Sequence, residues 1–238
     1  MSHMFFRLVV MRIRIRYGVT METKKEIRKQ ILQKRDALFD LERQQKSEEI
    51  VQKVIASEVF QNSDVFLLFS SYKSEVDVTK LIEYTLLLGK KVYLPKVIGL
   101  KMEFYRIFSM SELEDGYCGI KEPKVEPSRI FQPKKGEQIF VLLPGIAFDK
   151  EGGRIGYGKG FYDRFLEKLE IIIPQANISK VAVAFCCQIV DNGRIKKENH
   201  DILPDYIITE DVILSIFNHK NAKKRKGEYE YDKSKDSI

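Results

Sequence analysis

Residues 138–165 read QIFVLLPGIAFDKEGGRIGYGKGFYDRF, and this stretch decides the fold class. After Gln138 its first five residues are an unbroken apolar run, which is typical of a strand buried on both faces. A glycine-rich turn follows, and residues 160–170 carry the apolar spacing of an amphipathic helix. A buried strand that continues through a turn into a helix indicates the repeating unit of a parallel α/β sheet.

The same alternation extends along the chain on both sides of this stretch. Thr23 and Glu26 have the spacing of a capping box and open the first predicted helix. We expect helices at residues 23–38, 41–60, 78–88 and 160–170, and strands at residues 65–70, 91–94, 102–107, 138–143, 180–185 and 206–209. This order predicts a single-domain, doubly wound α/β fold with a largely parallel sheet and helices on both faces. The segment 109–136, rich in glycine, proline and charge, is expected to lie over the functional site.

Length and charge narrow the function classes. The 238 residues, 44% of them hydrophobic, suit one large α/β domain. The sequence contains no run of about 18 apolar residues, so no membrane-spanning helix is predicted. The net charge of +7 belongs to the ends, because residues 1–20 contribute +4 and residues 219–238 contribute +3. The neutral body argues against a broad nucleic-acid-binding face. We expect a leader at residues 1–21, the domain at residues 22–215 and a charged, disordered tail at residues 216–238.

The chain has three cysteines, Cys118, Cys186 and Cys187, an odd number without a C-x-x-C pair or metal-ligand spacing. Cys186 and Cys187 are adjacent within an apolar run, so we expect them to be buried free thiols. Free thiols fit a reducing cytosol, and the predicted location is therefore cytoplasmic. We expect a monomer or a weak homo-oligomer.

The turn at residues 152–163 has the composition of a phosphate site. Its glycines let backbone N–H groups face a ligand without an intervening Cβ, and the start of the following helix favours negative charge. Lys159 and Arg154 would add full positive charges for phosphate oxygens. A P-loop pattern ends at Lys159, but the next residue is Gly160 where a P-loop has Ser or Thr, and the glycine spacing also differs from the dinucleotide fingerprint. Asp163, in the first turn of the helix, is a carboxylate that could hold Mg²⁺ beside phosphates.

Residues 144–165, PGIAFDKEGGRIGYGKGFYDRF, closely resemble the signature of the 5-formyltetrahydrofolate cyclo-ligases, also called 5,10-methenyltetrahydrofolate synthetases. Three further segments agree: the first helix with Lys24, Arg28 and Arg35, the stretch FSSYKSEVDV with Glu75, and NHDILPDYIIT at residues 199–209. The resemblance covers about residues 22–210. It implies a doubly wound fold and the ATP- and Mg²⁺-dependent closure of 5-formyltetrahydrofolate to 5,10-methenyltetrahydrofolate. ADP and phosphate are released, and the reaction passes through a phosphorylated formyl (imidate) intermediate.

The resemblance also implies roles for residues of this chain. Lys159 and Arg154 would be catalytic, and Asp163 and Asp201 would hold Mg²⁺. The implied ATP-binding residues are Lys24, Lys25, Arg28, Arg154, Ile155, Gly156, Tyr157, Gly158, Lys159, Gly160, Phe161 and Tyr162. The implied contacts to the reduced folate are Ser70, Glu75, Tyr157, Gly158, Lys159, Gly160 and Phe161. Arg35 receives no role, and we expect His200 to be structural.

Two positions depart from the family pattern. Tyr157 stands where some members carry Arg, and Phe161 stands where Tyr is usual. Neither departure removes a charged or metal-binding residue that the site requires, so we expect activity to survive.

Two other functions stay open at this point. A sugar-phosphate isomerase or a CoA-transferase-like enzyme would use the glycine turn for a phosphate without ATP. A nucleic-acid-binding module would use the basic cluster KKRK at residues 223–226, and its affinity would fall steeply with salt. The neutral body and the lack of a recognisable binding motif argue against the nucleic-acid-binding module.

Overall fold

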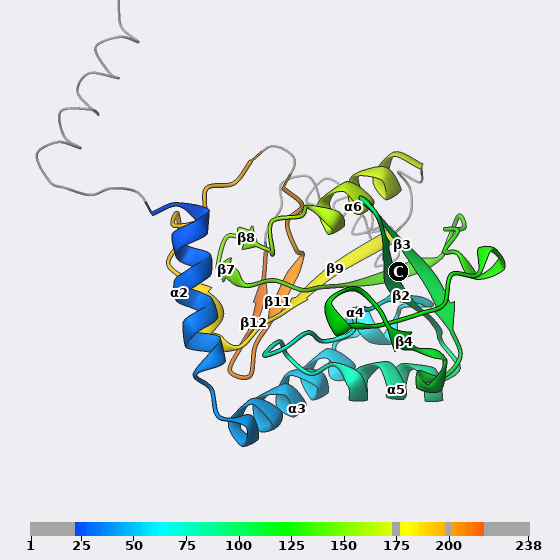
Figure 1. Ribbon diagram of the computed structural model, residues 1–238, viewed down its shortest axis with the longest axis horizontal. Coiled ribbons are helices and arrows are strands. Elements are labelled where there is room, and N and C mark those ends of the chain that lie inside the picture. Colours follow the sequence, from blue (N-terminus) through cyan, green and yellow to red (C-terminus); the bar gives the residue numbers. More distant parts are fainter. Residues whose placement is uncertain (1–21, 173–176, 199–200, 217–238) are drawn as a thin grey trace, which may run out of the picture.

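A seven-stranded sheet forms the centre of the protein (Figure 1). The computed structural model describes residues 22–172, 177–198 and 201–216, so the predicted leader, His200, the KKRK cluster and nearly all of the predicted tail lie outside the described residues. The strands are β1 (Val65–Leu67), β2 (Lys91–Ile98), β3 (Lys101–Ile107), β6 (Gln138–Leu143), β9 (Asn177–Val183), β11 (Tyr206–Ile208) and β12 (Ile213–Ser215). Their spatial order is β12-β11-β9-β6-β1-β2-β3. The five inner strands are parallel, and β3 and β12 pair antiparallel at the two edges.

Helices cover both faces of this sheet. On one face, α3 (Asp40–Ala56), α4 (Glu58–Gln61) and α5 (Thr79–Leu87) pack in a core that includes Phe66 of β1 and Phe140 of β6. On the other face, α6 (Phe161–Ile172) packs with Val65 and Val141 from the same two strands. Alternate residues of each strand therefore enter opposite cores, as the pleat requires. The predicted doubly wound fold with a largely parallel sheet is confirmed.

A second, small sheet lies beside the central one and was not predicted. It consists of β7 (Ala147–Asp149), β8 (Arg154–Ile155) and β10 (Ile189–Val190), with β7 in the middle. Helix α2 (Lys24–Asp36) packs on it through a separate core of buried side chains that includes Ile27, Ile31 and Ile155. Figure 1 shows α2 standing apart from the other helices, next to β7 and β8. The small sheet therefore fixes α2 beside the glycine turn.

Several element boundaries differ from the sequence predictions. The helix predicted at residues 41–60 is broken at Ser57, whose extended backbone ends α3 and whose hydroxyl accepts a hydrogen bond from the Phe60 amide at the start of α4. The strand predicted at residues 91–94 continues to Ile98 because it forms a long antiparallel hairpin with β3. The capping box at Thr23 and Glu26 is confirmed.

The segment 109–136 contains short elements instead of a plain loop. They are η1 (Met110–Glu112), β4 (Glu114–Asp115), η2 (Tyr117–Gly119), β5 (Lys121–Glu122) and η3 (Pro127–Arg129). No helix within the described ranges has both the length and the apolar content needed to cross a bilayer.

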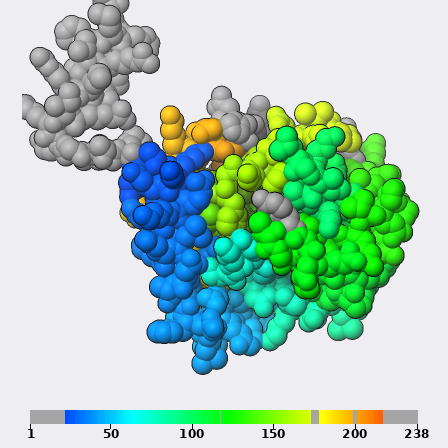
Figure 2. Space-filling model, in the orientation of Figure 1, coloured from blue at the N-terminus to red at the C-terminus, as the bar shows by residue number. Residues whose placement is uncertain are grey.

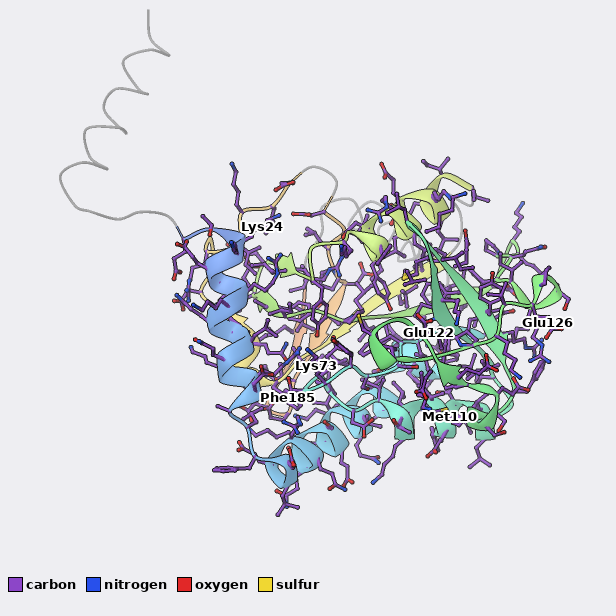
Figure 3. All side chains as sticks on the ribbon, viewed as in Figure 1. Lys24, Lys73, Met110, Glu122, Glu126 and Phe185 are labelled. Atoms are coloured by element: carbon purple, nitrogen blue, oxygen red, sulfur yellow. The ribbon has the colours of Figure 1, made fainter. Side chains whose placement is uncertain are left out.

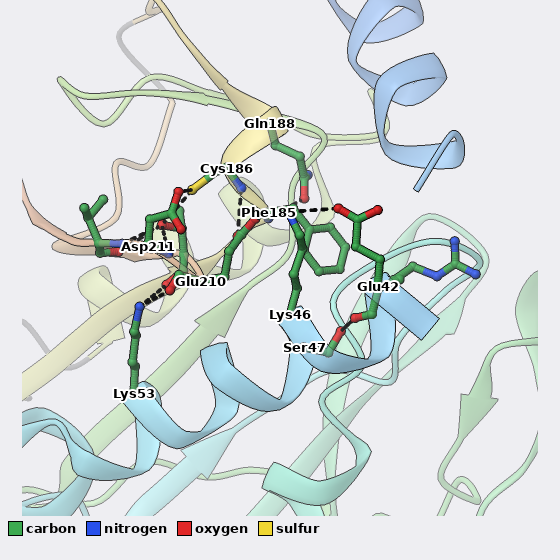
Figure 4. Close-up of polar contacts among 12 residues, drawn as sticks. Glu42, Lys46, Ser47, Lys53, Phe185, Cys186, Gln188, Glu210 and Asp211 are labelled. Carbon is green, nitrogen blue, oxygen red and sulfur yellow. Dashed lines mark hydrogen bonds and ion pairs between the residues drawn. The ribbon is translucent and has the colours of Figure 1, made fainter. Parts of the chain in front are cut away.

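A polar cluster ties α3 to the far edge of the sheet (Figure 4). Lys46 Nζ donates to the buried carboxylate of Glu210 at 2.9 Å, and the backbone amide of Cys186 donates to the same carboxylate at 2.9 Å. Lys53 donates to the carbonyl oxygens of Thr209 and Glu210.

The prediction that Cys186 and Cys187 are buried was wrong: both free thiols are only partly buried, because they lie in a short 3₁₀ turn after β9.

Candidate active site

The glycine turn is organised by one buried carboxylate. Asp149, at the end of β7, is fully buried, and its Oδ1 accepts hydrogen bonds from the amides of Gly153 at 2.7 Å and Glu151 at 3.0 Å. A Cβ on Gly153 would lie 2.4 Å from Asp149 Oδ2, so the close approach requires glycine at that position. Gly158 has a φ of +90°, a backbone conformation that side-chain-bearing residues rarely adopt.

A cavity of about 720 Å³ opens beside this turn. It lies at the carboxyl ends of β1 and β6, where Ser70 and Pro144 contribute to its wall. The chain leaves β1 towards α5 on one face and leaves β6 towards α6 on the other, so the cavity lies where the crossover direction reverses. Open α/β sheets bind their ligands at this point.

The cavity gathers nearly every residue that the sequence predicted for the site. Those lining it are Lys24, Arg28, Ser70, Glu75, Arg154, Ile155, Gly156, Tyr157, Gly158, Lys159, Gly160, Phe161, Tyr162, Asp163 and Asp201. Lys25 is the exception: it is exposed on α2 and does not line the cavity. In Figure 2, α2 and the green β2–β3 region lie on opposite sides of the yellow-green glycine turn. The walls therefore come from segments far apart in the sequence.

Three cationic side chains lie along the wall that α2 and the glycine turn share. Arg28 Nε donates to the carbonyl oxygen of Gly156 at 2.9 Å, and a Cβ built on Gly158 would lie 3.5 Å from Arg28 Nη2. Lys24 Nζ bonds to Asp201 at 3.1 Å and to Glu198 at 3.2 Å. Burial disfavours the charge on Lys24, but the hydrogen bonds to these two acids outweigh it and raise the pKa of the ammonium group. Lys159 is exposed and, within the described part of the chain, forms no ion pair.

Arg154 is held differently from the other cations. Its side chain is 7% exposed, and Nη2 bonds to Asp163 Oδ1 at 2.6 Å while Nη1 donates to the carbonyl oxygen of Pro144 at 3.2 Å. Asp163 Oδ1 also accepts a hydrogen bond from the amide of Ile202 at 3.3 Å. Arg154 and Asp163 therefore join the glycine turn, the start of α6 and the segment after β10. The guanidinium of Arg154 is largely committed to these contacts, although its buried Nε has no partner among the described atoms.

The two carboxylates predicted to hold Mg²⁺ lie on one side of this cavity, although each already pairs with a cation: Asp163 with Arg154 and Asp201 with Lys24. Among the described residues, no group of three or more His, Cys, Asp or Glu side chains is arranged to hold a metal ion. Mg²⁺ commonly binds through one or two carboxylates, waters and substrate phosphates. The donor set therefore fits a Mg²⁺ ion that arrives with a phosphate ligand, and it does not fit a resident metal held by the protein alone.

Glu75 lies on the opposite wall. It is 7% exposed, and its Oε2 accepts a hydrogen bond from the amide of Tyr72 at 2.9 Å. Burial raises the pKa of Glu75, whereas this amide, the charge of Arg35 and the hydroxyl of Tyr157 act in the opposite direction. The rings of Tyr72 and Tyr157 meet edge to face at a centroid distance of 6.0 Å. Ser70 Oγ is buried there without a hydrogen-bond partner in the described residues, as expected of a group that a ligand would satisfy.

The sequence analysis missed part of the lining. Glu122 of β5 is 3% exposed and pairs with Lys96 at 3.2 Å, and Cys118 lies exposed on the same segment. Figure 3 labels Glu122 near the middle of the molecule and Lys24 near the N-terminal end of α2. Part of the segment 109–136 lines the cavity, which agrees with its predicted position, but no motif in that segment identified Glu122.

The family of 5-formyltetrahydrofolate cyclo-ligases matches residues 20–210. A mouse 5-formyltetrahydrofolate cyclo-ligase is 31% identical over 193 residues, which are 79% of this chain and 94% of the mouse protein. A probable 5-formyltetrahydrofolate cyclo-ligase from Schizosaccharomyces pombe is 32% identical over 157 residues, or 63% of this chain and 76% of the yeast protein.

Solved structures agree with these sequence matches. The Aquifex aeolicus 5,10-methenyltetrahydrofolate synthetase superposes with a TM-score of 0.68 at 34% identity, and the match covers 82% of this chain and 93% of that one. A 5,10-methenyltetrahydrofolate synthetase from Mycoplasma pneumoniae gives a TM-score of 0.61 at 26% identity over 79% and 99% of the two chains. The chain, a ligase, therefore belongs to the 5-formyltetrahydrofolate cyclo-ligase family.

Proposed function

We propose that this protein uses ATP and Mg²⁺ to close 5-formyltetrahydrofolate to 5,10-methenyltetrahydrofolate and releases ADP and phosphate. One observation carries the proposal: a single cavity has cations from α2 and the glycine turn on one wall and the buried carboxylate of Glu75 on another. A triphosphate suits the cationic wall, and a flat heterocycle with N–H donors suits the wall with the carboxylate and aromatic rings. The terminal phosphate of ATP and the formyl group of the folate would thus meet in one cavity.

The chemistry explains why two substrates must meet. A formamide oxygen is a poor leaving group, so N10 of the folate cannot displace it directly. In the proposed reaction the formyl oxygen attacks the terminal phosphorus of ATP and the bond to ADP breaks. N10 then attacks the formyl carbon and loses its proton, the carbon–oxygen bond breaks, and phosphate leaves with the former formyl oxygen.

The cationic residues would act mainly by positioning. Enzymatic phosphoryl transfer depends on alignment and charge neutralisation. Lys24, Arg28 and Lys159 would hold the phosphates, because all three line the same cavity and Lys159 is free of acidic partners in the described structure. Mg²⁺, when bound with the nucleotide, would neutralise phosphate charge. Asp163 and Asp201 would hold it, and Arg154 would keep Asp163 in place.

The substrate wall would recognise the pterin edge. The ionised carboxylate of Glu75 would accept paired N–H donors, and Ser70 Oγ would gain the partner that it lacks. Tyr157 and Phe161 would line the groove that ATP and folate share. The cytoplasmic location and the monomeric or weakly oligomeric state stay predictions.

The test is an absorbance assay for the methenyl product. Purified protein receives 5-formyltetrahydrofolate with ATP and Mg²⁺, and parallel reactions omit ATP, replace it with a non-hydrolysable analogue, or contain EDTA. Product should form only in the complete reaction, in equal amounts with ADP. Product without ATP would favour an ATP-independent enzyme, and no product together with no ATP consumption would end the proposal.

A further inference from the structure

Arg35 is a buried charge outside the cavity lining. It is 1% exposed and lies in the last turn of α2. Its Nε donates to Ser74 Oγ at 3.0 Å, and its Nη2 donates to the hydroxyl of Tyr157 at 3.1 Å. Its Nη1 is buried without a partner among the described atoms. Burying a charged arginine costs free energy unless hydrogen bonds and a nearby opposite charge compensate it.

The two contacts join three parts of the cavity wall. Ser74 belongs to the loop that carries Glu75, and its hydroxyl also donates to Asp36 at the end of α2. Tyr157 belongs to the glycine turn and lines the cavity. Arg35 therefore fixes the distance between the loop that carries Glu75 and the turn that carries Tyr157.

The contact between Arg35 and Tyr157 also fixes which of the two groups donates the hydrogen bond. A guanidinium group has donors only, so the hydroxyl oxygen of Tyr157 must accept from Arg35. The hydroxyl proton is then left to point elsewhere. The ring of Tyr157 meets the ring of Tyr72, whose amide donates to Glu75 Oε2. Arg35 therefore reaches the loop of Glu75 directly through Ser74 and indirectly through Tyr157.

We propose that Arg35 is a positioning residue for the substrate wall: through Ser74 and Tyr157 it holds the loop of Glu75 so that the carboxylate faces the folate. This inference rests on the proposed function, because it assumes that Glu75 meets the pterin. It gives a role to a residue that touches neither substrate.

The proposal implies a pH dependence. The groups that face Glu75 are Arg35 on α2, Tyr157 on the turn, Tyr162 on α6 and the amide of Tyr72 on its own loop. Burial raises the pKa of Glu75, and Arg35 is the charged side chain among them that lowers it. Without Arg35, Glu75 would become protonated at a higher pH and would lose an acceptor for the pterin.

The test compares four variants with the wild type. Arg35→Met removes the charge, and Tyr157→Phe removes only the hydroxyl. Arg35→Lys keeps the charge but lacks the planar guanidinium group that donates to Ser74 and Tyr157 together. Arg43→Met is the matched control, since Arg43 is a partly buried arginine that binds the Leu38 carbonyl and Asp40 away from the cavity. For each variant the KM for 5-formyltetrahydrofolate and the KM for ATP are measured from pH 5 to pH 8.

Arg35→Met should raise the KM for folate about tenfold and leave the KM for ATP within about twofold, as expected when a charge-assisted contact is lost. The pH below which folate binding weakens should rise by about one unit, the lower end of the effect of a neighbouring opposite charge. Arg35→Lys should restore the pH profile but only part of the affinity. Tyr157→Phe should weaken folate binding and shift the profile less, and Arg43→Met should change neither.

A second readout does not depend on turnover. Carboxyl-labelled glutamate allows the titration of Glu75 to be followed by ¹³C NMR, with the signal assigned by its absence in Glu75→Gln. The Glu75 titration should move to higher pH in Arg35→Met and stay near the wild-type position in Arg35→Lys. An unmoved titration in Arg35→Met, or equal shifts in Arg35→Met and Arg43→Met, would overturn the role of Arg35. An inactive wild type that shows the expected titration would instead refute the proposed function alone.

Discussion

The glycine turn provides a sharp test of the structure, because two of its glycines have room for a methyl group but differ in backbone conformation. Gly158 has a φ of +90°, whereas Gly156 is absent from the positive-φ residues. A Cβ on Gly158 would meet Arg28 Nη2 at 3.5 Å, and a Cβ on Gly156 would meet Arg154 Nη1 at 3.9 Å, so both positions have ordinary van der Waals room. Backbone conformation, and not crowding, should therefore separate Gly158→Ala from Gly156→Ala.

The expected magnitudes follow from that difference. A left-handed backbone costs an L-residue about 1–2 kcal/mol, so Gly158→Ala should lower the free energy of unfolding by about this amount. For a domain of this size that corresponds to a fall in Tm of about 2–8 °C. Gly156→Ala should stay within about 0.5 kcal/mol of the wild type, or gain slightly, because alanine restricts the unfolded chain.

Thermal unfolding followed by circular dichroism, without ligands, measures both values. Enzyme activity does not separate the variants, since both glycines line the cavity and an added methyl group can obstruct a phosphate at either position. Equal losses of Tm in the two variants, or a larger loss in Gly156→Ala, would show that the assigned backbone conformation of the turn is wrong.

The remaining predictions concern three individual side chains. Lys159→Ala should reduce turnover by orders of magnitude while Tm stays unchanged, because the exposed ammonium has no ion pair to lose within the described residues; near-normal turnover would refute its role. Asp163→Asn should weaken Mg²⁺-dependent nucleotide binding about tenfold or more and should also remove the ion pair that holds the Arg154 side chain. An unchanged Mg²⁺ titration would argue against a metal role. Glu75→Gln should raise the KM for folate more than the KM for ATP, and equal effects would show that Glu75 does not meet the pterin. Because burial raises the pKa of Glu75 above the ordinary 4.5, the wild type should lose stability relative to Glu75→Gln as pH rises from about 4.5 to the raised pKa; a constant Tm difference between the two proteins would contradict this.

The sequence predicted the central sheet well because its strands are buried on both faces. Continuous apolar runs such as residues 65–68 and 139–143 leave little choice of structure, and the helices between them fix the parallel direction. The small sheet escaped prediction, since a strand of two residues such as Arg154–Ile155 carries no periodic signal. The break in the second helix depended on a single serine cap at Ser57, which apolar spacing does not reveal.

The lining of the cavity was predicted in outline, but the pairings of its side chains were not. The helix spacing places Lys24 and Arg28 on one side of α2, and both line the cavity, whereas Lys25 is turned about 100° from Lys24 and does not. Helix spacing also puts Arg35 on the side of α2 that carries the buried Ile27 and Ile31, but its complete burial could not be read from the sequence. The pairing of Arg154 with Asp163 likewise depends on how the turn folds back onto α6.

The placement of the three thiols gives the protein a built-in attachment point for a probe. Cys118 is exposed on the wall of the cavity, while burial, as the largest cause, raises the pKa of both Cys186 and Cys187 and so lowers their thiolate fractions at neutral pH. A maleimide dye used at low ratio should therefore attach first at Cys118, without any engineered cysteine. Its emission would then report when a molecule enters or leaves the cavity, in real time and independently of catalysis.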